Sequence, residues 1–202
     1  AMRGCRQGAR AHPEGDVWEH TLKCLEALRR PTFLTALATL LHDIGKPPTA
    51  DYAGGNVRFY RHAAVGADMA AEVADRLRLS GAQRDELVWV IRHHLDFMQI
   101  REMRNATLKR LFQSPHFPTL AEVYRADLIG SGASTADYRY LRRIYRKLKA
   151  ENLKPPALVT GHDVLAFGLS PGPAVGRILR TLYEEQLNGH LTDRDGAMQR
   201  AR

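Results

Sequence analysis

Apolar residues recur every three to four positions along almost the whole chain, and no stretch alternates convincingly between apolar and polar side chains. The first pattern is typical of amphipathic helices, whereas strict alternation would have indicated strands. We therefore predict an all-α fold. The expected helices span residues 16–29, 32–44, 63–79, 81–97, 105–113, 118–130, 136–151, 161–168, 172–188 and 193–201.

Some of these helices begin with residues that favour a reciprocal capping box. In such a box the first hydroxyl side chain accepts a hydrogen bond from the backbone N–H three residues later, and the side chain there accepts one in return. The pairs with this spacing are Ser80 with Gln83, Thr160 with Asp163, and Thr192 with Asp195. We interpret His162 and Asp163, although they form a His-Asp dipeptide, as part of such a cap.

Two segments interrupt the helical pattern of the chain. Residues 46–60, which are rich in proline, glycine and polar side chains, are expected to form a loop at the rim of a site. A second break, at residues 152–160 with Pro155 and Pro156, divides the chain. We predict a catalytic helical bundle of the HD type over residues 1–152 and a small helical appendage over residues 153–202.

Histidine and aspartate residues lie within or at the edges of the predicted helices, among apolar neighbours. Burying an imidazole or a carboxylate there is costly unless it is paired or bound to a metal. Imidazole nitrogens and carboxylate oxygens suit divalent transition metals such as Mn, Fe, Co, Ni or Zn. The candidate metal ligands are His20, His42, Asp43, His62, His93, His94 and Asp127.

The spacing of these ligands predicts two metal ions. Adjacent residues on a helix point about 100° apart, so Asp43 can reach a second ion while His42 binds the first. The first site would use His20, His42, Asp43 and Asp127. The second would share Asp43 and add His62 with either His93 or His94, because a regular helix cannot direct both to one point. Two ions roughly 3.5–4 Å apart can hold a bridging hydroxide and polarise a phosphoryl oxygen.

Catalytic and substrate-binding roles are predicted for residues near this pair. Asp43 is the predicted central catalytic residue, and Lys46 is a candidate for neutralising charge on a transferring phosphoryl group. Arg61 is a further candidate for substrate binding. The alternative for both cations is that they are solvated side chains at the rim.

The charge of the chain favours a polyanionic partner. Its formal net charge is +8 at pH 7, which suits phosphate contacts on nucleic acid, although a basic surface can also serve solubility alone. The basic run at residues 142–149 is either a solvated helix face or an RNA-backbone contact. The two cysteines, Cys5 and Cys24, make no disulfide framework, and we expect Cys24 to pack within its helix.

These features resemble a known family. His20, then His42-Asp43, then Asp127, with Leu41-His42-Asp43-Ile44-Gly45-Lys46 at the centre, resemble the signature of HD-domain metal-dependent phosphohydrolases. The additional histidines resemble those of its dinuclear members. The resemblance covers about residues 12–130 and implies a hydrolytic metal centre in a helical bundle.

A narrower resemblance covers nearly the whole chain. Residues 12–21, together with Gly161-His162-Asp163, Pro171-Gly172-Pro173 and Leu187-Asn188-Gly189, resemble the C-terminal HD region of bacterial CCA-adding tRNA nucleotidyltransferases and the poly(A) polymerase family. The Gly-Ser and paired-carboxylate motifs of that family's N-terminal head do not occur in these 202 residues. We therefore expect no nucleotide addition by this chain alone, whether it is free-standing or a fragment.

The resemblance implies hydrolysis of phosphorylated RNA or nucleotide ends, with 2′,3′-cyclic phosphates as the expected substrate. Two alternatives stay open: hydrolysis of a small nucleotide such as a dinucleoside polyphosphate or a deoxynucleotide, and a tRNA-binding body that works with a separate nucleotidyltransferase head. We expect no membrane partner and a cytoplasmic location, because the sequence shows no long apolar span or leader.

Overall fold

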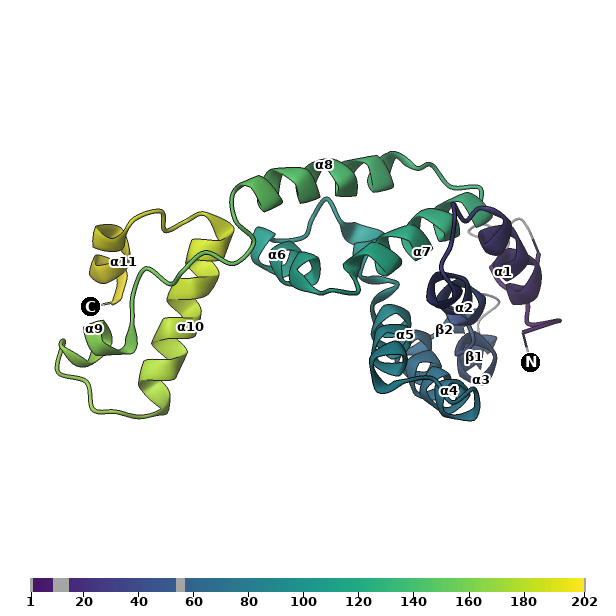
Figure 1. Cartoon of the computed structure of the whole chain (residues 1–202), viewed down its shortest axis with the longest axis horizontal. Helices are drawn as coiled ribbons and strands as arrows, with labels where there is room; N and C mark the ends of the chain where they lie inside the picture. The colour runs from purple at the N-terminus through teal and green to yellow at the C-terminus, as the bar shows by residue number, and fades with distance from the viewer. Residues whose placement is uncertain (1, 9–14, 54–56, 202) are drawn as a thin grey trace. The chain divides into compact units, whose positions relative to one another are not determined.

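The computed structural model describes residues 2–8, 15–53 and 57–201. Within these ranges the chain is helical apart from one small hairpin (Figure 1), so the prediction of an all-α fold is confirmed. The longer helices are α1 (Val17–Glu26), α2 (Phe33–Leu41), α4 (His62–Arg76), α5 (Gly81–His93), α6 (Asn105–Gln113), α7 (Phe117–Gly130), α8 (Ala136–Ala150), α10 (Pro173–Asn188) and α11 (Arg194–Ala201).

Several helices that carry candidate ligands are shorter than predicted: α1 ends at Glu26 rather than at residue 29, and α4 ends at Arg76 rather than at residue 79. The predicted helix 32–44 ends at Leu41, and residues 42–45 form a turn. The predicted helix 81–97 ends at His93 and is followed by the short 3₁₀ helix η2 (Asp96–Gln99). Apolar residues keep a helical spacing through these turns, so the pattern alone does not mark the helix end.

The predicted loop 46–60 contains ordered elements, which corrects that prediction. Helix α3 (Lys46–Thr49) comes first, and Pro47 and Pro48 suit its first turn because the first N–H groups of a helix have no partner within it. The strands β1 (Ala50–Asp51) and β2 (Arg58–Phe59) then pair antiparallel, with Ala50 opposite Phe59. Residues 54–56, which carry the Gly-Gly pair, lie outside the described residues.

Two of the predicted capping boxes are confirmed. Ser80 and Gln83 bond reciprocally at the start of α5, with the Ser80 N–H donating to Gln83 Oε1 at 3.0 Å. Thr160 and Asp163 do the same at the start of α9 (Gly161–Leu165), where Thr160 N–H donates to Asp163 Oδ2 at 2.7 Å. The dipeptide that contains Asp163 therefore serves a helix start.

The third predicted capping box, Thr192 with Asp195, is wrong. Helix α11 begins at Arg194, and the carboxylate that accepts a bond from its first turn is Asp193, whose Oδ1 receives the Gly196 N–H at 2.8 Å. Aspartate caps helices as well as threonine does, so the cap lies one residue later than expected.

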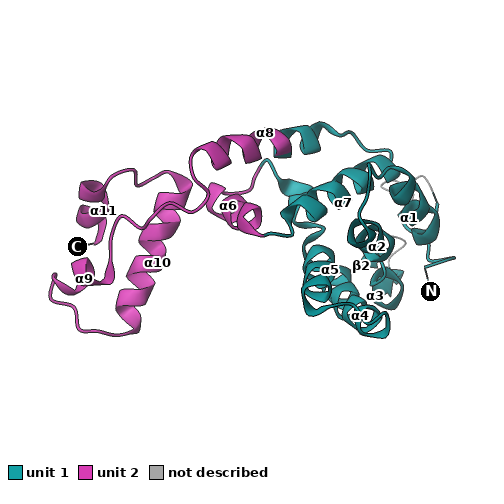
Figure 2. Ribbon diagram, in the orientation of Figure 1, with its two compact units in different colours: residues 1–101, 115–141 teal, residues 102–114, 142–202 magenta. Residues whose placement is uncertain are grey.

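The chain divides into two compact units, coloured separately in Figure 2. The first comprises residues 1–101 and 115–141, and the second comprises residues 102–114 and 142–202. This division groups α6 with the C-terminal helices and passes through α8, whereas we predicted domains at 1–152 and 153–202. Those domain bounds stay a prediction.

Helices in the first unit pack in pairs around a buried centre. Helix α4 packs along α5, α1 packs along α7, and α2 contacts α1, α5 and α7. The buried face of α4 is formed by small residues (Gly66, Ala67, Ala70 and Ala74), which allow close approach of α5. Apolar side chains such as Leu87 and Ile91 are fully buried in this unit. Polar side chains are buried beside them, and they form the site described below.

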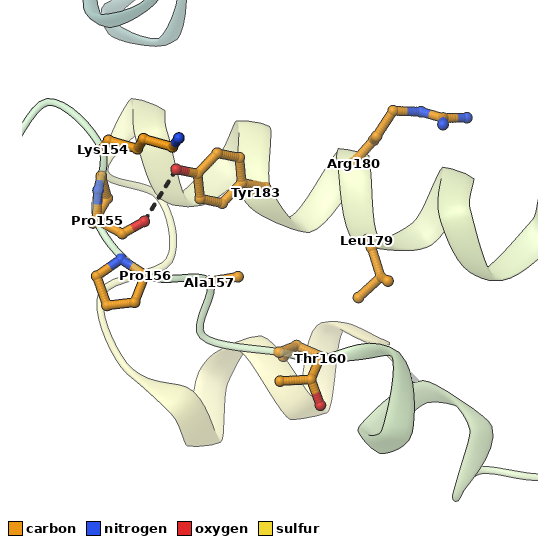
Figure 3. A pocket seen from close by; sticks show the side chains of 9 residues that line it. Lys154, Pro155, Pro156, Ala157, Thr160, Leu179, Arg180 and Tyr183 are labelled. Carbon is orange, nitrogen blue, oxygen red and sulfur yellow. Dashed lines mark hydrogen bonds between the residues drawn. The ribbon is translucent and has the colours of Figure 1, made fainter. Parts of the chain in front are cut away.

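The second unit has its own apolar core. Helix α10 contacts α6, α9 and α11, and Val159, Val164 and Leu182 belong to a buried cluster. A cavity of about 710 Å³ opens beside α10, where the Tyr183 hydroxyl donates to the Pro155 carbonyl at 3.0 Å (Figure 3). Its lining holds no imidazole or carboxylate, so the candidate chemistry lies in the first unit. No described helix is long and apolar enough to cross a membrane.

Candidate metal centre

All but one of the predicted ligands converge in the first unit. They come from α1, the turn after α2, the start of α4, the C-cap of α5 and helix α7. The converging ligands are, in that order, His20, His42 and Asp43, His62, His94 and Asp127. Most are deeply buried. The Asp127 side chain is 26% exposed, against 2% for Asp43, so the cluster opens toward solvent beside Asp127.

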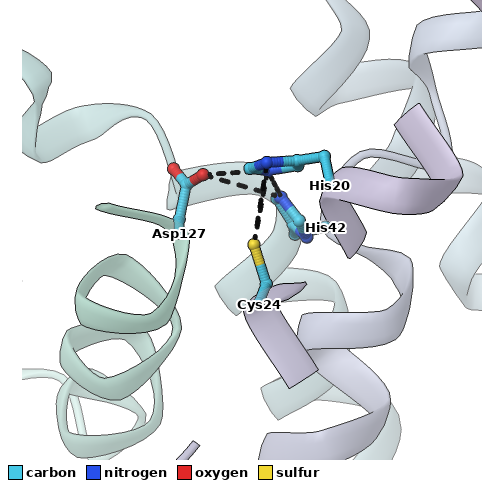
Figure 4. Close-up of side chains that lie close together, drawn as sticks. All are labelled: His20, Cys24, His42 and Asp127. Atoms are coloured by element: carbon cyan, nitrogen blue, oxygen red, sulfur yellow. Dashed lines mark hydrogen bonds and ion pairs between the residues drawn. The ribbon is translucent and has the colours of Figure 1, made fainter. Parts of the chain in front are cut away.

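The first group of donors surrounds His20 (Figure 4). His20 Nε2 lies 3.1 Å from Asp127 Oδ1 and 3.3 Å from His42 Nε2. Helix α1 presents His20 because the Asp16 carboxylate caps its start, accepting from the Trp18 and Glu19 N–H groups at 2.9 Å. Two imidazoles and a carboxylate therefore face one small volume.

The second group of donors surrounds the other side of Asp43. Asp43 Oδ1 lies 3.5 Å from His62 Nε2 and 3.7 Å from His94 Nε2. Asp43 Oδ2 lies 3.3 Å from His42 Nε2 and 3.7 Å from His20 Nε2. One carboxylate thus faces both groups, each through a different oxygen, which is the placement that a ligand bridging two ions requires.

Three imidazoles are oriented in the same way by the backbone. The Nδ1 atoms of His42, His62 and His94 lie 2.7–2.9 Å from the carbonyl oxygens of the residues three positions earlier. A carbonyl can only accept, so each Nδ1 carries a proton, and the Nε2 atoms of the His62 and His94 rings present lone pairs to the cluster. A bond of this kind fixes the tautomer of metal-binding histidines.

The second group fits a metal ion because its lone pairs have no other partner. Among the described residues, His62 Nε2 and His94 Nε2 are buried and have no hydrogen-bond partner. Burial lowers the pKa of His94 to about 4, and burial likewise lowers the pKa of His62. Both rings are therefore neutral near pH 7. Buried acceptors without a donor are costly, and a cation satisfies them.

The charges at the centre favour an ionised Asp43. Burial raises its pKa, but His42 and Lys46 beside it outweigh burial and hold the pKa well below its usual range. Burial lowers the pKa of His42, but Asp43 and Asp127 together raise it to about 9. The pair of carboxylates thus attracts positive charge to this point, whether as protons or as a metal ion.

His93, a predicted ligand, lies outside the cluster, which corrects its assignment. Its Nδ1 is 2.7 Å from Asp96 Oδ2, and its ring packs against Trp89 with centroids 4.5 Å apart. Neighbouring residues at a helix end point about 100° apart, so the backbone that directs His94 inward turns His93 outward. Of the two alternatives at this position, the structure brings only His94 to Asp43.

The predicted substrate-binding cations differ in their surroundings. Lys46 is buried, with Nζ 2.7 Å from Asp43 Oδ2 and donating to Gln7 Oε1 at 2.6 Å. It therefore contacts the bridging carboxylate directly. Arg61 is exposed and precedes α4 in a left-handed conformation with φ 61°. Gln7 was not predicted, because nothing in the sequence ties residue 7 to residue 46.

Cys24 is the ligand candidate that the sequence analysis missed. We expected it to pack within its helix, and it is fully buried, but its Sγ also lies 3.4 Å from His20 Nε2. The signal was present in the spacing: residues four apart share one face of a helix. Cys24 therefore belongs to the same group of potential donors as His20, His42 and Asp127.

A helical unit that gathers imidazoles and carboxylates from several helices around one buried aspartate is typical of metal-dependent hydrolases. The chain belongs to the HD domain family, whose model matches residues 16–131. This confirms the resemblance stated on His20, His42-Asp43 and Asp127. His12, Pro13 and Glu14, which are part of the narrower resemblance, lie outside the described residues.

Similarity to named proteins extends beyond residues 16–131. The chain is 33% identical to an A-adding tRNA nucleotidyltransferase of Deinococcus radiodurans over 94% of its own length and 46% of the relative's. It is 32% identical to a CC-adding tRNA nucleotidyltransferase of Thermus thermophilus, with 96% and 46% covered. A multifunctional CCA protein of Halorhodospira halophila is 36% identical over 56% of this chain. The chain thus spans about half the length of the first two relatives.

Proposed function

We propose that the protein is a phosphohydrolase that uses divalent metal ions and acts on the phosphorylated ends of RNA or nucleotides, with 2′,3′-cyclic phosphates as the principal substrate. The observation that carries this proposal is Asp43, whose two oxygens face two separate groups of imidazoles. When bound, two divalent ions polarise a phosphoryl oxygen and acidify water, which is the chemistry of phosphoester hydrolysis.

In this proposal the residues of the chain have separate roles in binding the ions, orienting the ligands and admitting the substrate. Asp43, His42, His20 and Asp127 would hold one ion, and Asp43 with His62 and His94 the other. Lys46 holds the bridging carboxylate through the 2.7 Å contact and keeps it ionised. Asp127, whose side chain is 26% exposed, marks the side from which a phosphate end reaches the centre.

RNA is proposed as the physiological partner on the basis of charge and of the relatives. The basic side chains of α8 are exposed, while Leu141 and Leu148 on the same helix are buried. Within residues 142–149 the exposed cations are Arg142, Arg143, Arg146, Lys147 and Lys149. The most fully covering relatives are tRNA nucleotidyltransferases, so this chain matches proteins that act on an RNA substrate.

Hydrolysis of 2′,3′-cyclic AMP by the purified chain tests the proposal. We expect release of a nucleoside monophosphate that is lost with chelator and restored by Mn, Co, Ni or Zn. Asp43→Asn should abolish it with helical content preserved, as measured by circular dichroism. Failure to cleave cyclic phosphates on nucleotides and RNA ends, in a protein shown to hold metal, would reject this substrate and leave deoxynucleotides and dinucleoside polyphosphates to be assayed.

A second comparison separates RNA from mononucleotides. If RNA is the substrate, an oligonucleotide ending in a 2′,3′-cyclic phosphate should compete better than the mononucleotide, and its advantage should shrink as salt rises because counterion release weakens. Changing Arg142, Arg143 and Arg146 to Gln should remove the advantage and spare cleavage of the mononucleotide. Equal competition at every salt concentration would favour the small-nucleotide alternative.

A second candidate function is a tRNA-binding body that works with a nucleotidyltransferase head. The alignment to both tRNA nucleotidyltransferases extends through the second unit as well as the HD region, which favours this candidate. It predicts tRNA binding that survives removal of metal and the change Asp43→Asn. The hydrolase proposal instead predicts that metal removal abolishes turnover, so binding and cleavage assays on the same variants distinguish the two.

A further inference from the structure

Cys24 lies among the potential metal ligands His20, His42 and Asp127. The residue follows His20 by one helical turn on α1, and both side chains are completely buried. The sulfur lies 3.4 Å from His20 Nε2 and 3.9 Å from Nδ1, beside the nitrogen that also meets His42 and Asp127 (Figure 4).

The spacing of these donors matches tetrahedral coordination of one ion. With bonds of about 2.3 Å to sulfur and about 2.1 Å to nitrogen, tetrahedral geometry separates nitrogen from sulfur by about 3.6 Å and two nitrogens by about 3.4 Å. The observed separations are 3.4 Å between Cys24 Sγ and His20 Nε2, and 3.3 Å between the Nε2 atoms of His20 and His42. His20 Nε2 lies 3.1 Å and His42 Nε2 4.0 Å from Asp127 Oδ1, and donor atoms of all four residues lie within 4.8 Å of one another, so the four are near enough to share one ion.

Hydrogen bonds alone do not account for this crowding. His20 Nε2 has three polar neighbours within 3.4 Å: Cys24 Sγ, His42 Nε2 and Asp127 Oδ1. An imidazole nitrogen offers one proton or one lone pair, so it satisfies one such neighbour well. A cation between the four donors satisfies all of them at once.

We propose that Cys24 is a thiolate ligand of the ion held by His20, His42 and Asp127. The inference rests on the metal centre of the proposed function and deepens it. On binding, the S–H bond breaks, its proton leaves to solvent, and a sulfur–metal bond forms, so that binding depends on pH. Thiolate is a soft ligand that favours Zn, Co or Fe over Mn or Mg. The site therefore selects borderline metals.

Gly130 of α7 keeps the sulfur in place. A Cβ atom at residue 130 would overlap Cys24 Sγ and approach the Cys24 backbone nitrogen to 3.0 Å. Only a residue without a side chain allows α7 to lie this close to α1, and this closeness leaves the sulfur directed toward His20. The thiol position is thus set by the packing of two helices.

Cobalt substitution provides a test on the full chain. Co(II) added to the apo protein should produce a thiolate-to-cobalt charge-transfer band in the near ultraviolet. Cys24→Ser should remove the band while Co(II) still binds, and the preference for Zn over Mn should fall by about tenfold or more. Cys5→Ser is the matched control, since Cys5 is also buried in the first unit but contacts Tyr52 instead. This variant should keep the band.

If Cys24→Ser does not fold, X-ray absorption spectroscopy of the unaltered protein loaded with Zn tests the same inference. We expect a sulfur scatterer at about 2.3 Å, which Cys5→Ser retains. Binding of Zn with nitrogen and oxygen scatterers alone would overturn the Cys24 inference and leave the proposed hydrolase intact. Absence of any bound Zn or Co would overturn both, so the two failures are distinguishable.

Discussion

Gly45 lies so closely against Gly66 that residue 45 has no room for a side chain. A Cβ atom on Gly45 would approach the Gly66 nitrogen to 2.6 Å and its Cα to 3.0 Å, and would overlap the His62 carbonyl oxygen. The turn that carries Asp43 therefore meets the start of α4 backbone to backbone. This contact holds Asp43 within reach of His62.

Gly45→Ala should disconnect the two groups of ligands. The added methyl group meets backbone atoms that cannot move aside, so the turn and α4 must separate, at a cost of about 1–3 kcal/mol in stability. We expect weaker binding of the second ion and strong loss of hydrolysis, measured by metal titration and turnover. Gly81→Ala is the matched control, because nothing lies within 4 Å of its Cβ position, and it should behave like the unaltered protein.

His94 and His93 provide a matched pair of neighbouring histidines. His94→Gln should remove one equivalent of bound metal and most activity, because its Nε2 faces Asp43 at 3.7 Å. His93→Gln should leave both unchanged, because His93 bonds to Asp96 outside the cluster. Elemental analysis of both variants measures the effect. Equal metal loss in the two variants would show that His93 also contributes to the centre.

Lys46→Gln tests the role of the buried cation beside Asp43. The change removes the 2.7 Å ion pair but leaves every proposed ligand in place. We expect metal content to be retained while kcat falls about 10–100-fold, the range seen when groups that support metal ligands are altered. Arg61→Gln is the comparison: a rise in KM without a change in kcat would assign Arg61 to substrate binding. A Lys46→Gln variant with full activity would exclude a catalytic role for Lys46.

Glu122 predicts a dependence of stability on pH. Its carboxylate accepts from Arg125 Nε and from the Arg29 N–H, both at 2.8 Å, and Arg125 Nη2 donates to the Ala27 carbonyl at 2.5 Å. Burial raises the pKa of Glu122, but Arg125 and the Arg29 N–H lower it below the ordinary 4.5. A lowered carboxyl pKa stabilises the fold above pH 4.5, and this contribution is lost as pH falls through the folded pKa.

The corresponding measurement is urea unfolding of Glu122→Gln against the unaltered protein. The variant should unfold at a lower urea concentration at pH 7, because the contact between α7 and the end of α1 is weakened. The difference should shrink as pH falls below 4.5, first because the unfolded chain binds the proton and then because the folded carboxylate is protonated at its lowered pKa. A constant difference across this range would mean that the charge of Glu122 does not contribute.

Much of the metal centre was predictable because its residues stand out in the sequence as ionisable side chains within apolar stretches. His42-Asp43 and Asp127 interrupt apolar stretches, and a buried carboxylate demands a partner wherever it occurs. The helices that carry them follow from apolar periodicity. The prediction could not choose between His93 and His94, because that choice depends on the last turn of α5 and the carbonyl of Ile91, which the His94 ring contacts.

Other contacts could not be predicted because they join distant segments. Gln7 reaches Lys46 through an N-terminal segment whose Cys5 carbonyl accepts the Val17 N–H at 3.0 Å. No local pattern encodes that pairing. Cys24 was interpreted as core because burial and metal ligation give the same apolar helical spacing, and only the approach of Gly130 determines where the sulfur points.

The sequence separation of the ligands also determines how much of the chain must fold before an ion can bind. His20 and Asp127 stand on α1 and α7, more than one hundred positions apart, yet lie 3.1 Å from each other. Each inward histidine ring of the second group is oriented by its own neighbouring carbonyl, so half of the centre is arranged locally. The first group of ligands forms only once α1 and α7, the two ends of a long segment of chain, have packed together. A metal ion there would be a reversible cross-link, and cross-links that close long loops oppose unfolding most strongly. Metal supply would thus govern how long the folded chain survives proteolysis, apart from any reaction it performs.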